Sequence, residues 1–300
     1  MTKDSIMSDT STDFIASKYL KKEEPDQYGQ RHPVENDILK KDSLLLLEEE
    51  LAKQSPEARI SLDQAEAKCP GLVRSDEHRL AFLRCEQFNT SKAAIRLVNY
   101  WDTRIELFGE NAFSDLTLKG LLKEDIESLQ LGFTHLLAGK DAAGRAIIFV
   151  DPTCLDKVIS RESLIKATWY MLHAALEEES AQQKGVVFIV YLREAEIRHF
   201  DTTFTRMLAG SVKGVLPVRV SALHFCHPPK LLSILFSLVQ FLLGEKLTKR
   251  IRMHDGETDE SVLNALEECG IPRHFIPIEL GGKVHLNIKK WITDRSAAEK

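Results

Sequence analysis

Residues 185–191 read Gly-Val-Val-Phe-Ile-Val-Tyr, a glycine followed only by β-branched and aromatic residues. Such a short run predicts a strand that is buried on both faces of a sheet. Similar runs at 145–150 and 220–225 predict two more strands, and 251–254 is a candidate fourth. Helical segments at 163–178 and 203–216 separate these strands. Alternation of strand and helix predicts an α/β fold with a largely parallel sheet covered by helices.

The chain before this sheet is helical in pattern. Asp42 or Ser43 can cap a first helix, Ser75 or Asp76 a second, and apolar residues recur at helical spacing from Thr90 until Gly109. Residues 1–41 are polar, charged and without periodicity, so we expect a disordered tail. We therefore predict four regions: a tail at 1–41, a helical domain at 42–125, the α/β domain at 126–292 and a C-terminal tail at 293–300.

Composition places the protein in the cytoplasm and away from nucleic acid. The net charge is -5 and the pI about 6.1, so no global attraction to nucleic acid or to an anionic membrane is expected. The five cysteines are scattered and never spaced as CxxC, which favours reduced, mostly buried thiols. Residues 1–20 lack the apolar core of a secretory signal, and Thr2 stands where myristoylation requires glycine.

The sequence lacks the motifs of common enzymes. Residues 139–146 have a P-loop-like spacing but no Lys-Ser/Thr pair, and residues 209–214 miss the first glycine of GxSxG. The histidines never form HExxH, and His224 and His227 lack a nearby third metal ligand. These absences predict a protein that is not an enzyme and holds no metal or cofactor.

An apolar segment at 231–243 is the most informative feature for function. Its thirteen residues, LLSILFSLVQFLL, are apolar on nearly every face of a helix, yet a membrane span needs about 20 residues. Two interpretations remain open. The helix is either buried on all sides in a core, or it places one face on a hydrophobic ligand and offers the other to a membrane.

A basic cluster follows the apolar segment directly. Lys246 and Arg250 are four residues apart, so a helix would place them on one face, where they could hold a phosphorylated headgroup. The alternative is an ordinary solvated charged face. An apolar helix beside a basic cluster is nonetheless what an interfacial membrane contact requires.

Five motifs in fixed order resemble the CRAL-TRIO family. They are DEHRLAFLRCEQF at 76–88 (family LLRFLRARxFD), DAAGR at 141–145 (DxxGRPV), PVRVSALHF at 217–225 with Pro229 (FPxRVxxIHxIN and NxP), EKLTKRIRMH at 245–254 (EKIKERIHMHG) and FIPIELGG at 275–282 (LPxEYGG). The resemblance covers about 76–292 and is strongest to the branch that contains the tocopherol and retinaldehyde carriers.

The resemblance implies a helical bundle, a lipid pocket floored by the sheet and a gate helix at 231–243. It also implies phosphoinositide contacts at Lys246, Arg250 and Arg219, whereas two further basic positions of the family read Ser221 and Glu86 here. The DLEG motif of the family reads Tyr-Leu-Arg-Glu at 191–194, and its Asn before the strand-end proline reads His227.

We expect alternate strand residues and one face of the gate helix to line the pocket. The candidates are Phe149, Val187, Ile189, Leu235, Phe236 and Val239, with Leu231, Leu238, Phe241 and Leu242 on the gate helix. The leading hypothesis is a monomeric, cytoplasmic, non-enzymatic carrier of one hydrophobic lipid that associates transiently with phosphoinositide membranes. The alternatives are a phosphoinositide-responsive adaptor and, third, a lipid-acting enzyme.

Overall fold

The computed structural model describes residues 21–230, 240–241 and 244–299. The chain divides into two compact units, Met1–Asp102 and Thr103–Lys300. The domain boundaries expected from the sequence, at 41/42, 125/126 and 292/293, remain predictions. Among the described residues, no helix is both long and apolar enough to cross a membrane.

The first unit is helical, as the sequence predicted. It contains α2 (Asp37–Ala52), α3 (Pro56–Lys68), α4 (Pro70–Val73), α5 (Asp76–Cys85) and most of α6 (Thr90–Phe108). The expected cap of α5 is confirmed, because the Ser75 hydroxyl accepts the His78 amide at 3.2 Å. The expected cap of the first helix is wrong: α2 begins at Asp37, where the Asn36 side chain accepts the Leu39 amide at 2.8 Å.

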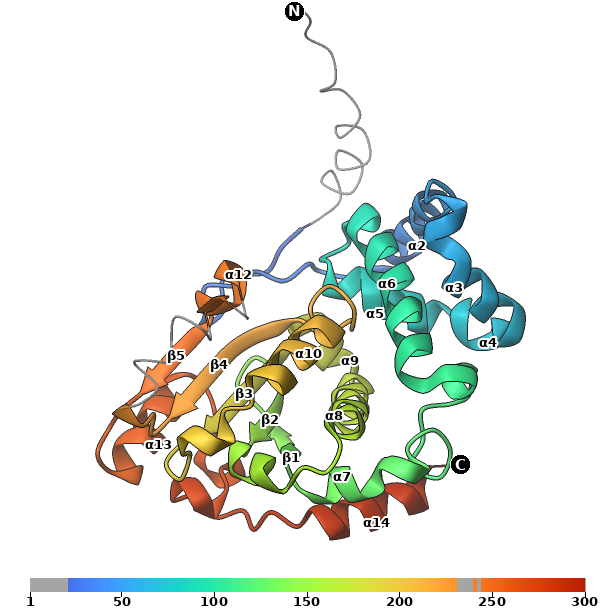
Figure 1. Ribbon diagram of the computed structural model, residues 1–300. Helices are drawn as coiled ribbons and strands as arrows, with labels where there is room; N and C mark the ends of the chain where they lie inside the picture. Colours follow the sequence, from blue (N-terminus) through green and yellow to red (C-terminus); the bar gives the residue numbers. More distant parts are fainter. Residues whose placement is uncertain (1–20, 231–239, 242–243, 300) are drawn as a thin grey trace, which may run out of the picture. The chain divides into compact units, whose positions relative to one another are not determined.

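The second unit is built around a five-stranded sheet in the order β1-β2-β3-β4-β5 (Figure 1). The strands are β1 (Thr134–Lys140), β2 (Ala146–Val150), β3 (Val186–Tyr191), β4 (Val220–Cys226) and β5 (Ile251–His254). All pairs after the antiparallel β1–β2 pair are parallel. The largely parallel sheet and the candidate fourth strand are thereby confirmed. Strand β1 was not predicted, because Gly139 and Lys140 interrupt its apolar pattern.

Helices α8 (Arg161–Leu176) and α10 (Thr202–Val212) are the crossovers of the parallel strands. The order β2-β3-β4 advances in one direction, so right-handed crossovers place both helices on the same face of the sheet. The two helices contact each other accordingly. Helix α10 ends at Val212, earlier than the sequence indicated, and Lys213 is its C-cap.

The second unit also contains five further α-helices among its described residues. They are α7 (Ile126–Gln130), α9 (Glu179–Lys184), α12 (Glu245–Thr248), α13 (Asp259–Glu268) and α14 (Ile288–Ala298). Of these, α7 and α9 contact α8, and α14 contacts α7. Residues 293–298 thus continue α14, where Arg295 pairs with Glu177 and donates to the Tyr170 hydroxyl at 2.9 Å.

Candidate functional site

The register between β2, β3 and β4 sorts their side chains onto two faces of the sheet. Phe149, Ile189 and His224 are aligned across the three strands and share one face. Phe149 is 1% exposed, and Val187 and Ile189 are 0% exposed. The side chains of this first face are therefore buried from water, and we call it the closed face.

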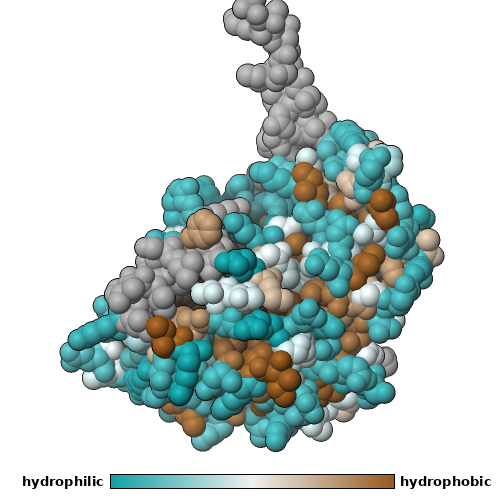
Figure 2. Space-filling view, viewed as in Figure 1, coloured by the Kyte–Doolittle hydropathy of each residue, from teal (hydrophilic) through white to brown (hydrophobic). Residues whose placement is uncertain are grey.

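The opposite face is apolar and incompletely covered. Phe188, Val190, Leu223 and Ile251 project from it, and each is only partly buried. The last three pack, together with Phe200, on a cluster of Leu192, Ala195 and Phe225. Partly exposed apolar side chains on neighbouring strands are what the floor of a hydrophobic ligand site requires. Figure 2 shows hydrophobic patches among a mostly hydrophilic surface on the side of the molecule that carries α10.

The strand residues that the sequence proposed for the pocket lie on the closed face. Side chains alternate along a strand, so a choice that is one residue out of phase selects the opposite face. Phe149, Val187 and Ile189 are core residues in this structure, and their place in a lipid pocket remains a prediction. Of the gate residues, Phe241 is helical and 80% exposed. The remaining pocket and gate candidates lie outside the described residues: Leu231, Leu235, Phe236, Leu238, Val239 and Leu242.

The two predicted arginines point toward backbone carbonyls. Arg219 is 8% exposed and donates to the Gln183 carbonyl. A headgroup contact would require Arg250 to be exposed, but Arg250 is partly buried and donates to the Val220 carbonyl. Lys246 lies on α12. The arginines therefore brace the start of β4 and β5, and in this arrangement they do not offer their guanidinium groups to a surface ligand.

Comparison with known proteins identifies the architecture. The model of the CRAL/TRIO domain family matches residues 132–282. The chain belongs to the CRAL/TRIO family. Members of this family are known for lipid binding and lipid transfer. The resemblance that the motifs indicated is thereby confirmed.

Individual CRAL/TRIO relatives are distant. The alpha-tocopherol transfer protein-like protein of Mus musculus is 25% identical over 303 residues, covering 96% of this chain and 82% of the relative. Clavesin-2 of Mus musculus is 28% identical over 222 residues, which cover 71% of this chain and 63% of the relative. The crystal structure of Sfh5 aligns with a TM-score of 0.54 at 12% identity, covering 89% of this chain and all of that one, and this likeness supports the fold alone.

Two departures from the CRAL/TRIO motifs are partners in the structure. Nη2 of Arg193, after β3, lies 2.6 Å from Nε2 of His227, after β4. A guanidinium group can only donate, so this histidine nitrogen accepts. Arg193 also pairs with Asp259 at the start of α13, and this bond holds the pKa of that carboxyl below its usual value. The sequence showed both departures but not their contact, which depends on the neighbouring ends of two parallel strands.

His227 carries additional conformational strain at the entrance to the gate segment. Its φ of +52° lies in the left-handed region, which side chains other than glycine rarely adopt. The Arg193–His227–Asp259 cluster, named here the latch, therefore fixes the residue between the end of β4 and the two prolines, Pro228 and Pro229. The loop at 227–230, which leads to the gate segment, is thereby tied at His227 to both β3 and α13.

A stacked histidine pair joins β4 to β5 on the closed face. Nδ1 of His224 lies 2.8 Å from Nε2 of His254, and the ring planes differ by 10°. Among the described residues, no group of three His, Cys, Asp or Glu side chains could hold a metal. Burial, with a smaller contribution from His254, lowers the pKa of His224 to about 3.

The lowered pKa of His224 predicts acid sensitivity. The folded state keeps this ring neutral, so its protonation favours the unfolded chain. The contribution is fully present above pH 6.5 and is lost as the pH falls toward 3. Replacing His224 by Gln should make the fall in unfolding free energy between pH 6.5 and 5 shallower, by up to about 1.4 kcal/mol per pH unit. Denaturant titrations at several pH values test this, and parallel curves for parent and variant would contradict it.

Proposed function

We propose that this CRAL/TRIO protein is a non-enzymatic carrier that holds one hydrophobic lipid against the partly exposed face of its sheet. The observation that supports this proposal is that Phe188, Val190, Leu223 and Ile251 remain partly accessible on one face of strands β3, β4 and β5. A folded protein gains about 25 cal/mol for each Å² of apolar surface removed from water, so a hydrophobic ligand on this face is favoured. The carrier name of the alpha-tocopherol transfer protein-like relative agrees with a small apolar cargo.

Exchange of the lipid would take place at a membrane that contains phosphoinositides. Phe241, 80% exposed, offers an apolar side chain to the bilayer, and Lys246 lies on the short helix that follows. Transient docking from the cytoplasm would then combine insertion of apolar residues with attraction to anionic headgroups. Arg219 and Arg250 would join only if they exchanged their carbonyl partners for phosphate oxygens.

Native mass spectrometry of protein purified from cells tests the carrier function. The parent protein should release a stoichiometric amount of lipid. The change Leu223→Trp fills space above the apolar face and should reduce the lipid released at least several-fold. Ile60→Trp serves as the matched control, because Ile60 lies in the first unit and is 55% exposed. Folded parent protein without any bound lipid, or equal lipid content in both variants, would contradict the proposal.

Membrane contact is tested with the basic cluster after the gate segment. The double change Lys246→Ala with Arg250→Ala should weaken binding to phosphoinositide vesicles roughly tenfold, since each basic residue contributes about 1 kcal/mol near an anionic surface. Arg250→Ala also removes the hydrogen bond that the Val220 carbonyl accepts, so the single change Lys246→Ala is measured as well as the double change.

The neighbouring change Lys249→Ala provides the control for this measurement. Lys249 is exposed and paired with Glu245 at 2.6 Å, so its removal should alter vesicle binding much less. Co-sedimentation is measured at low and high salt, with and without phosphoinositide. If the double variant binds at low salt as well as the parent does, Lys246 and Arg250 are not the membrane contact.

A further inference from the structure

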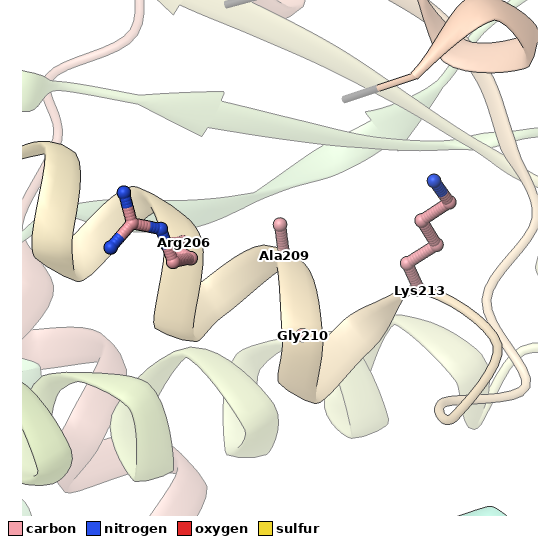
Figure 3. Close-up of a pocket in the computed structure, with 4 residues that line it drawn as sticks. All are labelled: Arg206, Ala209, Gly210 and Lys213. Atoms are coloured by element: carbon pink, nitrogen blue, oxygen red, sulfur yellow. The ribbon is translucent and has the colours of Figure 1, made fainter. Parts of the chain in front are cut away.

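A shallow hollow on α10 has the features of an anion site outside the predicted phosphoinositide residues. Its volume is about 270 Å³, and it is lined by Arg206, Ala209, Gly210 and Lys213. These positions fall at i, i+3, i+4 and i+7, so they share one helical face. Figure 3 shows Arg206 and Lys213 extending from the same side of α10, with the methyl group of Ala209 between them.

The two cations of the hollow are exposed and available to a ligand. Within the described part of the chain, neither Arg206 nor Lys213 forms an ion pair with a carboxylate. The neighbouring acids are engaged elsewhere: Asp201, the cap of α10, pairs with Arg161, and Glu245 pairs with Lys249. The hollow thus retains an uncompensated charge of two, which distinguishes it from the paired lysine on α12.

The side chains between the two cations are small, so they leave room for a phosphate group. Ala209 and Gly210 lie between the cations, and no atom lies within 4 Å of the position that a Cβ on Gly210 would take. Seven residues of helix separate the two cations by roughly 10 Å along the axis. A phosphate between them can accept from the fork of Arg206 and from the ammonium group of Lys213.

Lys213 also lies beside the glycine that precedes α12. Its Nζ lies 2.8 Å from the position that a Cβ on Gly244 would take, and Gly244 has a φ of +76°. The C-cap of α10 is therefore adjacent to the glycine that precedes α12. An anion that draws Lys213 into the hollow would move this cation relative to that glycine.

We propose that the α10 hollow binds the phosphate group of an anionic membrane lipid through Arg206 and Lys213. The proposal rests on the proposed function, because a carrier must dock on a membrane to exchange its lipid. It adds a second point of contact, on a different helix from Lys246. Two separated contacts would fix the orientation of the protein on the bilayer, which a single cluster cannot do.

The test is a matched pair of variants at Gly210. Gly210→Glu places a carboxylate between the cations, whereas Gly210→Gln has nearly the same size and no charge. Both improve helix propensity over glycine and meet open space, so both should fold. We expect the Glu variant to bind phosphatidylcholine vesicles containing phosphatidylserine at least about fivefold more weakly than the Gln variant at low salt, with a smaller difference at high salt.

Soluble inositol trisphosphate, titrated calorimetrically, separates the two sources of phosphate. Weaker vesicle binding by the Glu variant supports the proposal. Equal vesicle binding by the Glu and Gln variants overturns it. If the Glu variant loses binding of inositol trisphosphate but keeps vesicle binding, the site serves a free phosphate compound and the lipid assignment is wrong. Lipid content measured on the same preparations keeps the carrier function separate, because stoichiometric lipid with equal vesicle binding rejects this site alone.

Discussion

Replacing Asp141 by Asn is expected to lower the free energy of unfolding of the second unit by about 3–5 kcal/mol, the usual cost of leaving one member of a buried ion pair unpaired. The side chains of Asp141 and Arg145 are both 0% exposed, and their charged atoms are 2.9 Å apart. The carboxylate also accepts the backbone amides of Ala143 and Arg145 at 3.0 and 2.8 Å. The pair closes the turn between β1 and β2.

The reason for the large effect is the guanidinium group that remains. Arg145 also donates Nε to the Lys184 carbonyl at 3.1 Å, so it cannot swing into water without breaking the link to α9. Removing both charges in Asp141→Asn with Arg145→Met should therefore cost less than Asp141→Asn alone. Urea titrations of the single and double variants provide the measurement, and an Asp141→Asn variant as stable as the parent would contradict this account.

The sequence was sufficient to predict most of the sheet. The runs that became β2, β3 and β4 are short, apolar at nearly every position and rich in β-branched and aromatic residues, and together these features favour strands over helices. The family motifs then gave the order of the elements and the approximate place of the gate segment. What remained ambiguous was the phase of each strand. A strand that is apolar at every position gives no indication of which alternate set faces the ligand, and Val187 was chosen where Val190 is the accessible residue.

The partners of individual cations were also beyond sequence reasoning. Arg219 and Arg250 match basic positions of the family motifs, yet each guanidinium donates to a backbone carbonyl from a neighbouring segment. Arg206 and Lys213 match no motif, and their shared face appears only once α10 has formed. The direction of a long charged side chain depends on which acceptors lie within reach, and those acceptors come from distant parts of the sequence.

Gly281 contacts the latch through Asp259. It ends the short 3-10 helix at Ile278–Leu280 with a left-handed conformation, φ +77° and ψ 9°. A Cβ at this position would lie 2.6 Å from Cβ of Asp259, closer than real contacts allow. Asp259 is also the residue that accepts from Arg193 and lies 3.1 Å from His227. The absence of a Cβ at Gly281 thus leaves room for Asp259, one of the residues that hold His227.

The change Gly281→Val is therefore expected to destabilise the second unit and to disturb the gate. A β-branched residue at positive φ costs about 1–3 kcal/mol of backbone strain, and forcing atoms into a packed contact adds about 1–3 kcal/mol. Gly109→Val is the matched control, since Gly109 has a φ of +55° but nothing within 4 Å, so only the backbone cost should remain. Thermal unfolding compares the two variants. If the displaced Asp259 releases His227, lipid transfer between vesicles should also change in Gly281→Val but not in Gly109→Val at a temperature where both are folded. Equal midpoints for Gly281→Val and the parent would show that the left-handed glycine and its contact with Asp259 carry no stability.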